Sequence, residues 1–232
     1  MSEVSVPHRD SGPPLVGRKR VVLFDLDGTL VDTAPDLGFA LNAMRRERGL
    51  KPLAYAELRA QASHGARGLI RLGFGLGPDD PGFETLRQEF LEIYAGVLTA
   101  RSSLFPGMGE VLSALEAQGV PWGVVTNKPA RFSEPLLRHL GLYERAACVV
   151  SGDTCAQPKP HPAPLLHACQ HTGTEPGACL YVGDAARDVE AAQAAGMPAV
   201  VALWGYLGSG DRPETWGADA LIASPGAIFD HL

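Results

Sequence analysis

The chain has 232 residues, of which 45% are hydrophobic and 20% are charged, a balance typical of globular proteins. Its formal net charge of −6 provides no basic surface of the kind that binds nucleic acid or an anionic membrane. The first residues contain no apolar core like that of a secretory signal, and no run of about 18 apolar residues occurs along the chain. We therefore expect a cytoplasmic protein with neither a nucleic-acid partner nor a membrane partner.

The residue pattern changes twice along the chain. Residues 1–18 are rich in Ser, Pro, Gly and charge without periodicity, which predicts a flexible N-terminal arm. After a short apolar strand at 20–24, residues 35–104 place apolar side chains at helical spacing, with glycines as breaks and no comparable β-run. From residue 105 onward, helices and strands alternate. The predicted helices are 109–118, 130–140, 162–171 and 186–195, and the predicted strands are 120–126, 147–151, 178–183, 197–203 and 218–222.

Alternating strands and helices indicate a parallel sheet that is covered on both faces. The first strand cannot stand alone, so it must join the same sheet. We therefore predict an α/β fold, a Rossmann-like doubly wound parallel sheet with an inserted all-helical cap domain. The core would comprise residues 19–34 and 105–232, and the cap would comprise residues 35–104.

Polar residues follow several predicted strands directly at their carboxyl ends. In an open parallel α/β sheet, this edge holds the ligand site. Alternation along the first strand also places Asp25 and Asp27 on the same side of the chain. The residues that we expect to converge at this edge are Asp25, Asp27, Thr126, Asn127, Lys128, Lys159, Asp184 and Asp188.

Four aspartates in one crevice would repel one another strongly unless a cation offsets their charge. Mg²⁺ prefers oxygen ligands and typically combines one or two carboxylates with a phosphate group. Lys159 lies in a proline-rich loop and would add positive charge, while Thr126 and Asn127 would donate hydrogen bonds. Such a site suits an oxyanion with several negative charges, such as a phosphoryl group.

Four motifs in a fixed order, "DLDGT", "VVTNKP", "KPHP" and "GDxxxD", resemble those of the haloacid dehalogenase-like phosphohydrolase superfamily. The resemblance runs from residue 20 to about residue 223, and the helical insertion is similar to the type 1 cap of that superfamily. "DTAPDL", "GAR", "VVTNKP" and "KPHPAPLL" resemble phosphoglycolate phosphatases. "PGFETLRQEFLEIY", "WGVVTNKPARFSEPLL" and "WGAD" are closer to the neighbouring N-acetylmuramic acid 6-phosphate phosphatases.

The resemblance implies a role for each acid and for the lysine. Asp25 would attack phosphorus and form an aspartyl-phosphate, which water later hydrolyses. Asp27 would protonate the leaving alkoxide and then act as the base for water. Lys159 would bridge Asp25 and the phosphate and stabilise the developing charge.

The resemblance also implies a Mg²⁺ site formed by Asp25, the backbone carbonyl of Asp27, Asp184 and Asp188. Asp188 would face the same way as Asp184 one helical turn on and would bind the ion directly or through water. Ala185 and Ala186 stand where Ser and Arg are frequent in this motif, so the hydrogen bonding around the ligands is expected to differ from the common form.

Substrate contacts would come from both domains. Gly28 and Thr29 would shape the loop under the phosphate, and Thr126 and Asn127 would hold its nonbridging oxygens. Arg67 of the cap, in "SHGARGL", could bind a substrate carboxylate, with His64 as a weaker candidate. The aromatic residues near the last strand are expected to serve packing: Trp204, Tyr206 and Trp216.

We therefore expect a Mg²⁺-dependent phosphomonoester hydrolase that acts on a small phosphorylated metabolite as a monomer or homodimer. Phosphoglycolate phosphatase is the first candidate, and N-acetylmuramic acid 6-phosphate phosphatase, an enzyme of cell-wall recycling, is the alternative. A phosphoryl mutase would use the same Asp25 and Asp27 but would shield the phosphoenzyme from water. A noncatalytic regulator would be expected to lose Asp25 or Lys159, and a dehalogenase would not need Asp27.

Overall fold

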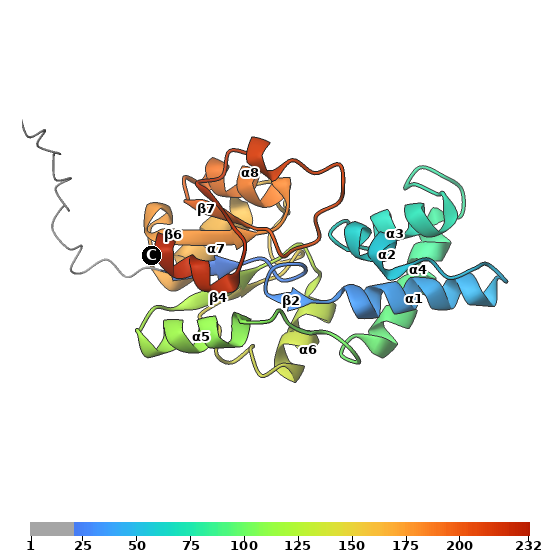
Figure 1. The fold of residues 1–232 in the computed structure, drawn as a ribbon, viewed down its shortest axis with the longest axis horizontal. Helices are drawn as coiled ribbons and strands as arrows, with labels where there is room; N and C mark the ends of the chain where they lie inside the picture. Colours follow the sequence, from blue (N-terminus) through green and yellow to red (C-terminus); the bar gives the residue numbers. More distant parts are fainter. Residues whose placement is uncertain (1–20) are drawn as a thin grey trace, which may run out of the picture.

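The computed structural model describes residues 21–232, and its core is a six-stranded parallel sheet with helices on both faces (Figure 1). The strands, in their order across the sheet, are β5 (Val149–Val150), β4 (Trp122–Val125), β1 (Val21–Phe24), β6 (Cys179–Gly183), β7 (Ala199–Ala202) and β8 (Ala220–Ile222). All five neighbouring pairs are parallel. The first strand thus lies inside the sheet, and the predicted α/β fold is confirmed.

Side-chain alternation along the strands builds two hydrophobic layers. Val22 and Phe24 pack on one face with α5 (Met108–Ala117), α6 (Ala130–His139) and the closing 3₁₀ helix η3 (Pro225–His231). Val21 and Leu23 pack on the other face with α7 (Ala163–Thr172) and α8 (Ala186–Ala195). Since β1 is buried on both faces, it reads as a continuous apolar run, as strands of covered parallel sheets do.

The helical region inserted after β1 lies to the right of the sheet in Figure 1. It contains α1 (Ala34–Glu47), α2 (Tyr55–Ala62), α3 (Gly65–Phe74) and α4 (Phe83–Val97). The buried side chains of Leu41, Leu58, Leu69 and Phe90 come one from each of these helices, and all belong to the larger hydrophobic cluster. The inserted helices and the sheet therefore share continuous packing.

Two short connections join the inserted helices to the sheet, and they pair with each other. β2 (Val31–Asp32) and β3 (Ser103–Leu104) form an antiparallel ladder. Next to it, the buried carboxylate of Asp36 accepts hydrogen bonds from the backbone N–H groups of Arg101 at 2.9 Å and Ser102 at 2.8 Å. The outgoing and returning chains are thereby tied together. The sequence did not predict this ladder, because two residues per strand are too few to show a period.

Several predicted elements differ from the observed ones at their ends. The strand expected at 147–151 is reduced to β5, and the one expected at 218–222 begins later, at β8. Two short 3₁₀ helices, η1 (Pro176–Ala178) and η2 (Pro213–Thr215), were not predicted. The arm expected at 1–18 lies outside the described residues.

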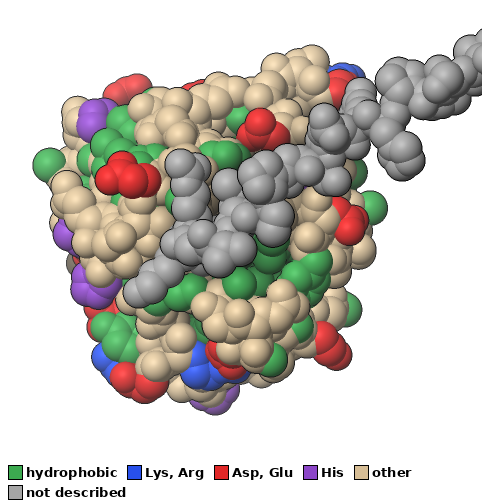
Figure 2. Space-filling model, turned by 90° about the vertical axis from the view of Figure 1, so that its left-hand side faces the viewer, with side chains coloured by type: hydrophobic (Ala, Val, Ile, Leu, Met, Phe, Trp, Pro, Cys, Tyr) green, Lys and Arg blue, Asp and Glu red, His purple; other side chains and the backbone are tan. Residues whose placement is uncertain are grey.

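Helix hydropathy and one face of the surface describe the character of the outside of the molecule. Among residues 21–232, none of the helices combines the length and the apolar character that crossing a membrane requires. On the part of the surface that the described residues form in Figure 2, lysine and arginine side chains are few and do not gather into a patch. This view agrees with the acidic net charge of −6.

Candidate active site

Three neighbouring strands end at the same edge of the sheet and place polar side chains there. β1 lies between β4 and β6 and is parallel to both. Asp25 directly follows β1, Thr126 directly follows β4, and Asp184 directly follows β6. All three side chains are buried, whereas Asp27, two residues beyond Asp25, is half-buried. The central position of β1 therefore determines which groups surround Asp25.

Lys159 is the cation at the centre of this group. Its buried Nζ lies 3.0 Å from Asp25 Oδ1 and 2.7 Å from Asp188 Oδ1, and it donates to the hydroxyl of Tyr181 at 2.6 Å. Burial raises the pKa of Asp25, and the positive charge of Lys159 partly opposes this effect. Burial would also raise the pKa of Asp188, but Lys159 and Arg187 outweigh it and hold that pKa below its ordinary value. The lysine thus favours the ionised form of both acids.

Asn127 fixes the loop that carries this lysine. Its side-chain N–H donates to the carbonyl oxygen of Lys159 at 2.8 Å, and the N–H of Lys159 donates to Asn127 Oδ1 at 3.0 Å. The sequence predicted that Asn127 holds phosphate oxygens. That role stays a prediction: the side-chain oxygen and one side-chain N–H pair with the lysine loop, and the amide has a second N–H besides these.

Three buried acids form a candidate metal centre. Asp25, Asp184 and Asp188 each offer a carboxylate oxygen, and these oxygens all lie within 4.8 Å of one another. Burial, and after it the charges of Asp25 and Asp188, raises the pKa of Asp184 to about 8. A cation among these acids would relieve their repulsion, and a set of carboxylate oxygens suits a hard ion such as Mg²⁺. The donor set therefore fits the metal that the sequence predicted.

Asp184 and Asp188 are placed at this centre by backbone geometry that the sequence did not predict. Asp184 precedes α8, whereas Asp188 lies in the first turn of that helix and accepts a hydrogen bond from the N–H of Ala185 at 3.1 Å. They do not lie one above the other on a helix face, as their spacing suggested. The bend between β6 and α8 brings both carboxylates to the cluster.

The loop after Asp27 passes close to the metal centre. Gly28 has a φ of +89°, and a Cβ atom at this position would lie 2.2 Å from Asp184 Oδ2 and 2.9 Å from the ring of Tyr206. Only glycine fits both this backbone conformation and this space. Asp184 is held further by the N–H of Tyr206 at 2.8 Å and by the hydroxyl of Thr29 at 3.2 Å.

Tyr206 and Trp204, expected as packing residues, also brace the chain where it leaves the site. Tyr206 is buried, and its hydroxyl accepts hydrogen bonds from the N–H groups of Thr33 at 2.6 Å and Ala34 at 2.9 Å. The indole N–H of Trp204 donates to the carbonyl oxygen of Thr29 at 3.0 Å. These bonds hold both the loop under the proposed phosphate position and the start of α1.

Asp27 is joined to the inserted helices through a residue to which the sequence assigned no role. Lys128 Nζ donates to Asp27 Oδ1 at 3.0 Å and to the hydroxyl of Tyr94, on α4, at 2.7 Å. The hydroxyl of Thr33 also donates to Asp27 Oδ1, at 2.5 Å. No period or motif could have shown that a lysine after β4 meets a tyrosine of α4.

A cavity of about 490 Å³ lies between the inserted helices and the sheet edge. Asp25 and Asp27 line it on the sheet side, and Arg67 and His64 line it at the start of α3. A neighbouring cavity of about 420 Å³ shares part of its wall. The shared residues are Arg87, Leu91, Arg131 and Phe132.

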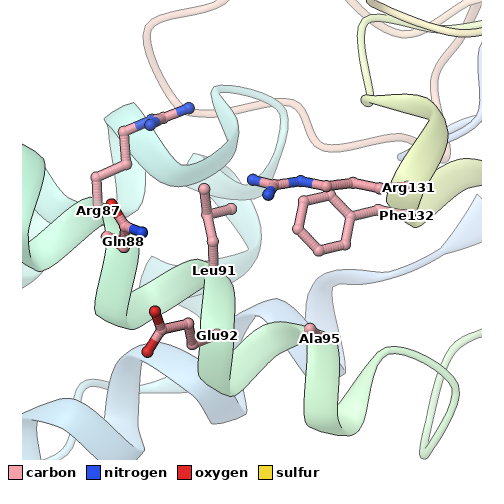
Figure 3. A pocket seen from close by; sticks show the side chains of 7 residues that line it. All are labelled: Arg87, Gln88, Leu91, Glu92, Ala95, Arg131 and Phe132. Carbon is pink, nitrogen blue, oxygen red and sulfur yellow. The ribbon is translucent and has the colours of Figure 1, made fainter.

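Figure 3 shows how the walls meet. The side chains of Arg87 on α4 and Arg131 on α6 reach toward the same space beside Leu91. The cavity is thus lined by the carboxylates of Asp25 and Asp27 at the sheet edge and by arginines where the neighbouring cavity adjoins it.

Arg187 forms a second link that the sequence missed. Its Nη2 donates to the hydroxyl of Ser63, at the end of α2, at 3.0 Å. Burial would lower the pKa of Arg187, but Asp188, Asp25 and Asp184 raise it. The arginine stands one position later than the arginine frequent in this motif, and it lines the cavity between the two parts.

Comparison with known proteins agrees with this geometry. Residues 19–196 match the haloacid dehalogenase-like hydrolases. The chain belongs to this family and is a hydrolase, as the motifs predicted. A crystal structure described as a predicted phosphoglycolate phosphatase from Haemophilus somnus 129PT superposes with a TM-score of 0.81. It is 28% identical in sequence, and the match covers 94% of this chain and 99% of that one.

Two relatives cover nearly the whole chain. The N-acetylmuramic acid 6-phosphate phosphatase of Pseudomonas aeruginosa is 43% identical over 215 residues, which are 93% of this chain and 95% of that protein. A phosphoglycolate phosphatase of Xanthomonas campestris pv. campestris is 45% identical over 211 residues, which are 91% and 95% of the two chains. The two named activities thus stand at nearly equal identity.

Proposed function

We propose that the chain is a Mg²⁺-dependent phosphomonoesterase that works through an aspartyl-phosphate on Asp25. The observation that carries this proposal is the ion pair of Lys159 with Asp25, beside the acidic cluster at the end of β1. The phosphatase names of the relatives support it. A cation held by the acidic cluster would neutralise charge on the phosphoryl group and on Asp25.

The proposed reaction has two steps, transfer of the phosphoryl group to Asp25 and hydrolysis of the resulting aspartyl-phosphate. A carboxylate oxygen of Asp25 attacks phosphorus while the bond to the ester oxygen breaks, and Asp27 gives that oxygen a proton. Water then attacks the phosphoryl group, Asp27 takes a proton from it, and Asp25 is released with free phosphate. Lys159 would stabilise the charge that develops on the transferring group, and Thr126 would donate to its oxygens.

The substrate would be a phosphomonoester that also carries a carboxylate. Both named relatives act on such compounds by their names, phosphoglycolate and N-acetylmuramic acid 6-phosphate. Arg67, Arg87 and Arg131 border the cavity and could pair with the carboxylate. 2-Phosphoglycolate is the first candidate from the motifs. N-acetylmuramic acid 6-phosphate is the second candidate. The cavity of about 490 Å³, with a second cavity beside it, supports this larger compound.

Phosphate release from the two candidates tests the proposal. Purified protein would be assayed with each compound at equal concentration, with Mg²⁺ and then with excess chelator. We expect release from one of the two, and its loss with the chelator. A protein that releases no phosphate from any phosphomonoester would contradict the proposal, and isomerisation without release would indicate a mutase.

A further inference from the structure

Lys128 is a buried cation whose ammonium group faces both parts of the molecule. Its side chain is 6% exposed, and its Nζ contacts the carboxylate of Asp27 on the sheet side and the hydroxyl of Tyr94 on α4. The Nζ also lies 4.7 Å from the centre of the Tyr94 ring. A charge is costly to bury unless it is paired, so these partners hold the ammonium group at this position.

The ring of Tyr94 and the backbone of Lys128 are themselves held in place. The ring of Tyr94 stacks on Phe90 with centroids 6.2 Å apart and packs at a tilt against Phe132 at 5.5 Å. The backbone N–H of Lys128 donates to Thr126 Oγ1 at 3.1 Å, which ties the lysine to the turn that follows β4. The lysine therefore stands between the aromatic packing of α4 and the carboxylate of Asp27.

We propose that Lys128 is a positioning residue that orients the Asp27 carboxylate toward the leaving oxygen, and that Tyr94 holds Lys128 in this position. The inference rests on the proposed phosphatase function. A carboxyl group protonates an ester oxygen well only when it lies within hydrogen-bond reach of that oxygen. Asp27 is half-buried at the cavity edge, and Lys128 and the buried hydroxyl of Thr33 both bind its Oδ1. With Oδ1 held on both sides, Oδ2 is the oxygen left to face the substrate.

The proposal predicts a dependence on the leaving group that a purely structural role would not produce. An alkoxide needs a proton to depart, whereas p-nitrophenolate departs without one. A poorly positioned acid should therefore slow the hydrolysis of alkyl phosphate esters far more than the hydrolysis of p-nitrophenyl phosphate. The ratio kcat/KM is the correct measure, because it reports phosphoryl transfer and excludes the later hydrolysis of the phosphoenzyme.

The experiment compares the wild type with Lys128→Met and Tyr94→Phe. Each would be assayed with p-nitrophenyl phosphate and with whichever of 2-phosphoglycolate and N-acetylmuramic acid 6-phosphate the wild type hydrolyses faster. For Lys128→Met we expect kcat/KM to fall about 100-fold on the alkyl ester and about 10-fold or less on the aryl ester. Tyr94→Phe keeps the ring packing and removes only the hydroxyl. We expect its kcat/KM to fall several-fold on the alkyl ester and less on the aryl ester.

Matched controls separate this effect from a general loss of folding. Lys51→Met changes an exposed lysine, and Tyr143→Phe removes a hydroxyl away from the cavity, so neither should alter the ratio between the two esters. Lys128→Arg restores a cation and should recover part of the activity on the alkyl ester.

Equal losses on both esters in Lys128→Met and Tyr94→Phe would overturn the inference while leaving the proposed function intact. A wild type that hydrolyses neither ester would instead overturn the proposed function and the inference together.

Discussion

Lys159 Nζ lies 3.0 Å from Asp25 Oδ1 in a position that is closed to solvent, directly beyond the central strand of the sheet. The same ammonium group also pairs with Asp188 at 2.7 Å. One cation thus serves the proposed nucleophile and a proposed metal ligand together. Its removal should therefore affect chemistry and stability at the same time.

Lys159→Met is expected to lower kcat by about 10²- to 10³-fold, because the charge beside the transferring group is lost. It should also lower the free energy of unfolding by about 3–5 kcal/mol, since two buried carboxylates lose their partner. Steady-state kinetics and urea unfolding would measure the two effects. Lys51→Met serves as the exposed control, and turnover within a few-fold of the wild type would contradict the role of Lys159.

Gly28→Ala should weaken Mg²⁺ binding and lower turnover by at least about 10²-fold, because misplacement near a reacting centre is costly. The added Cβ would lie 2.2 Å from Asp184 Oδ2. Gly49→Ala is a matched control, since Gly49 also has a positive φ of +68° but has no atom within 4 Å of the added Cβ. Mg²⁺ titration of activity would compare them. Equal behaviour of the two variants would show that the space around Gly28 does not matter.

Stability should depend on pH differently with and without Mg²⁺. The pKa of Asp184 rises from 3.8 to about 8 on folding, so between about pH 4 and pH 8 the folded chain keeps a proton that the unfolded chain loses. The free energy of unfolding of the metal-free protein should therefore fall as pH rises through this window. The raised pKa of Asp25 acts in the same direction, while the lowered pKa of Asp188 acts only below this range.

Because Mg²⁺ competes with that proton, it should raise Tm more at about pH 8 than at about pH 6. Thermal unfolding at both pH values, with Mg²⁺ and with chelator, measures this difference. Asp184→Asn removes the titrating group and should abolish most of the difference between the Mg²⁺-induced Tm shifts at the two pH values. A Mg²⁺-induced shift in Tm that is the same at both pH values would count against the acidic cluster as the metal site.

Much of the fold and of the site could be predicted from local patterns. The apolar run before Asp25 and the alternation of helices and strands after residue 105 indicate a covered parallel sheet. In such a sheet, polar residues that follow neighbouring strands must meet, which is why Asp25, Thr126 and Asp184 could be grouped without coordinates.

The remaining features depend on contacts between distant parts of the chain. Lys128 meets Tyr94, and Arg187 meets Ser63, only because the inserted helices fold back over the sheet edge. The carboxylate of Asp36 ties the two connections together, and the sequence analysis assigned it no role. Such single contacts cannot be predicted from the sequence, because they produce no periodic spacing of residues.

The most direct test of the central claim is phosphate release by Asp25→Asn under conditions where the wild type shows chelator-sensitive turnover. Asparagine nearly preserves the shape of the side chain but cannot form the aspartyl-phosphate. We predict that turnover falls to the background level while circular dichroism shows an intact fold. Turnover by a folded Asp25→Asn protein at a rate close to that of the wild type would contradict the account.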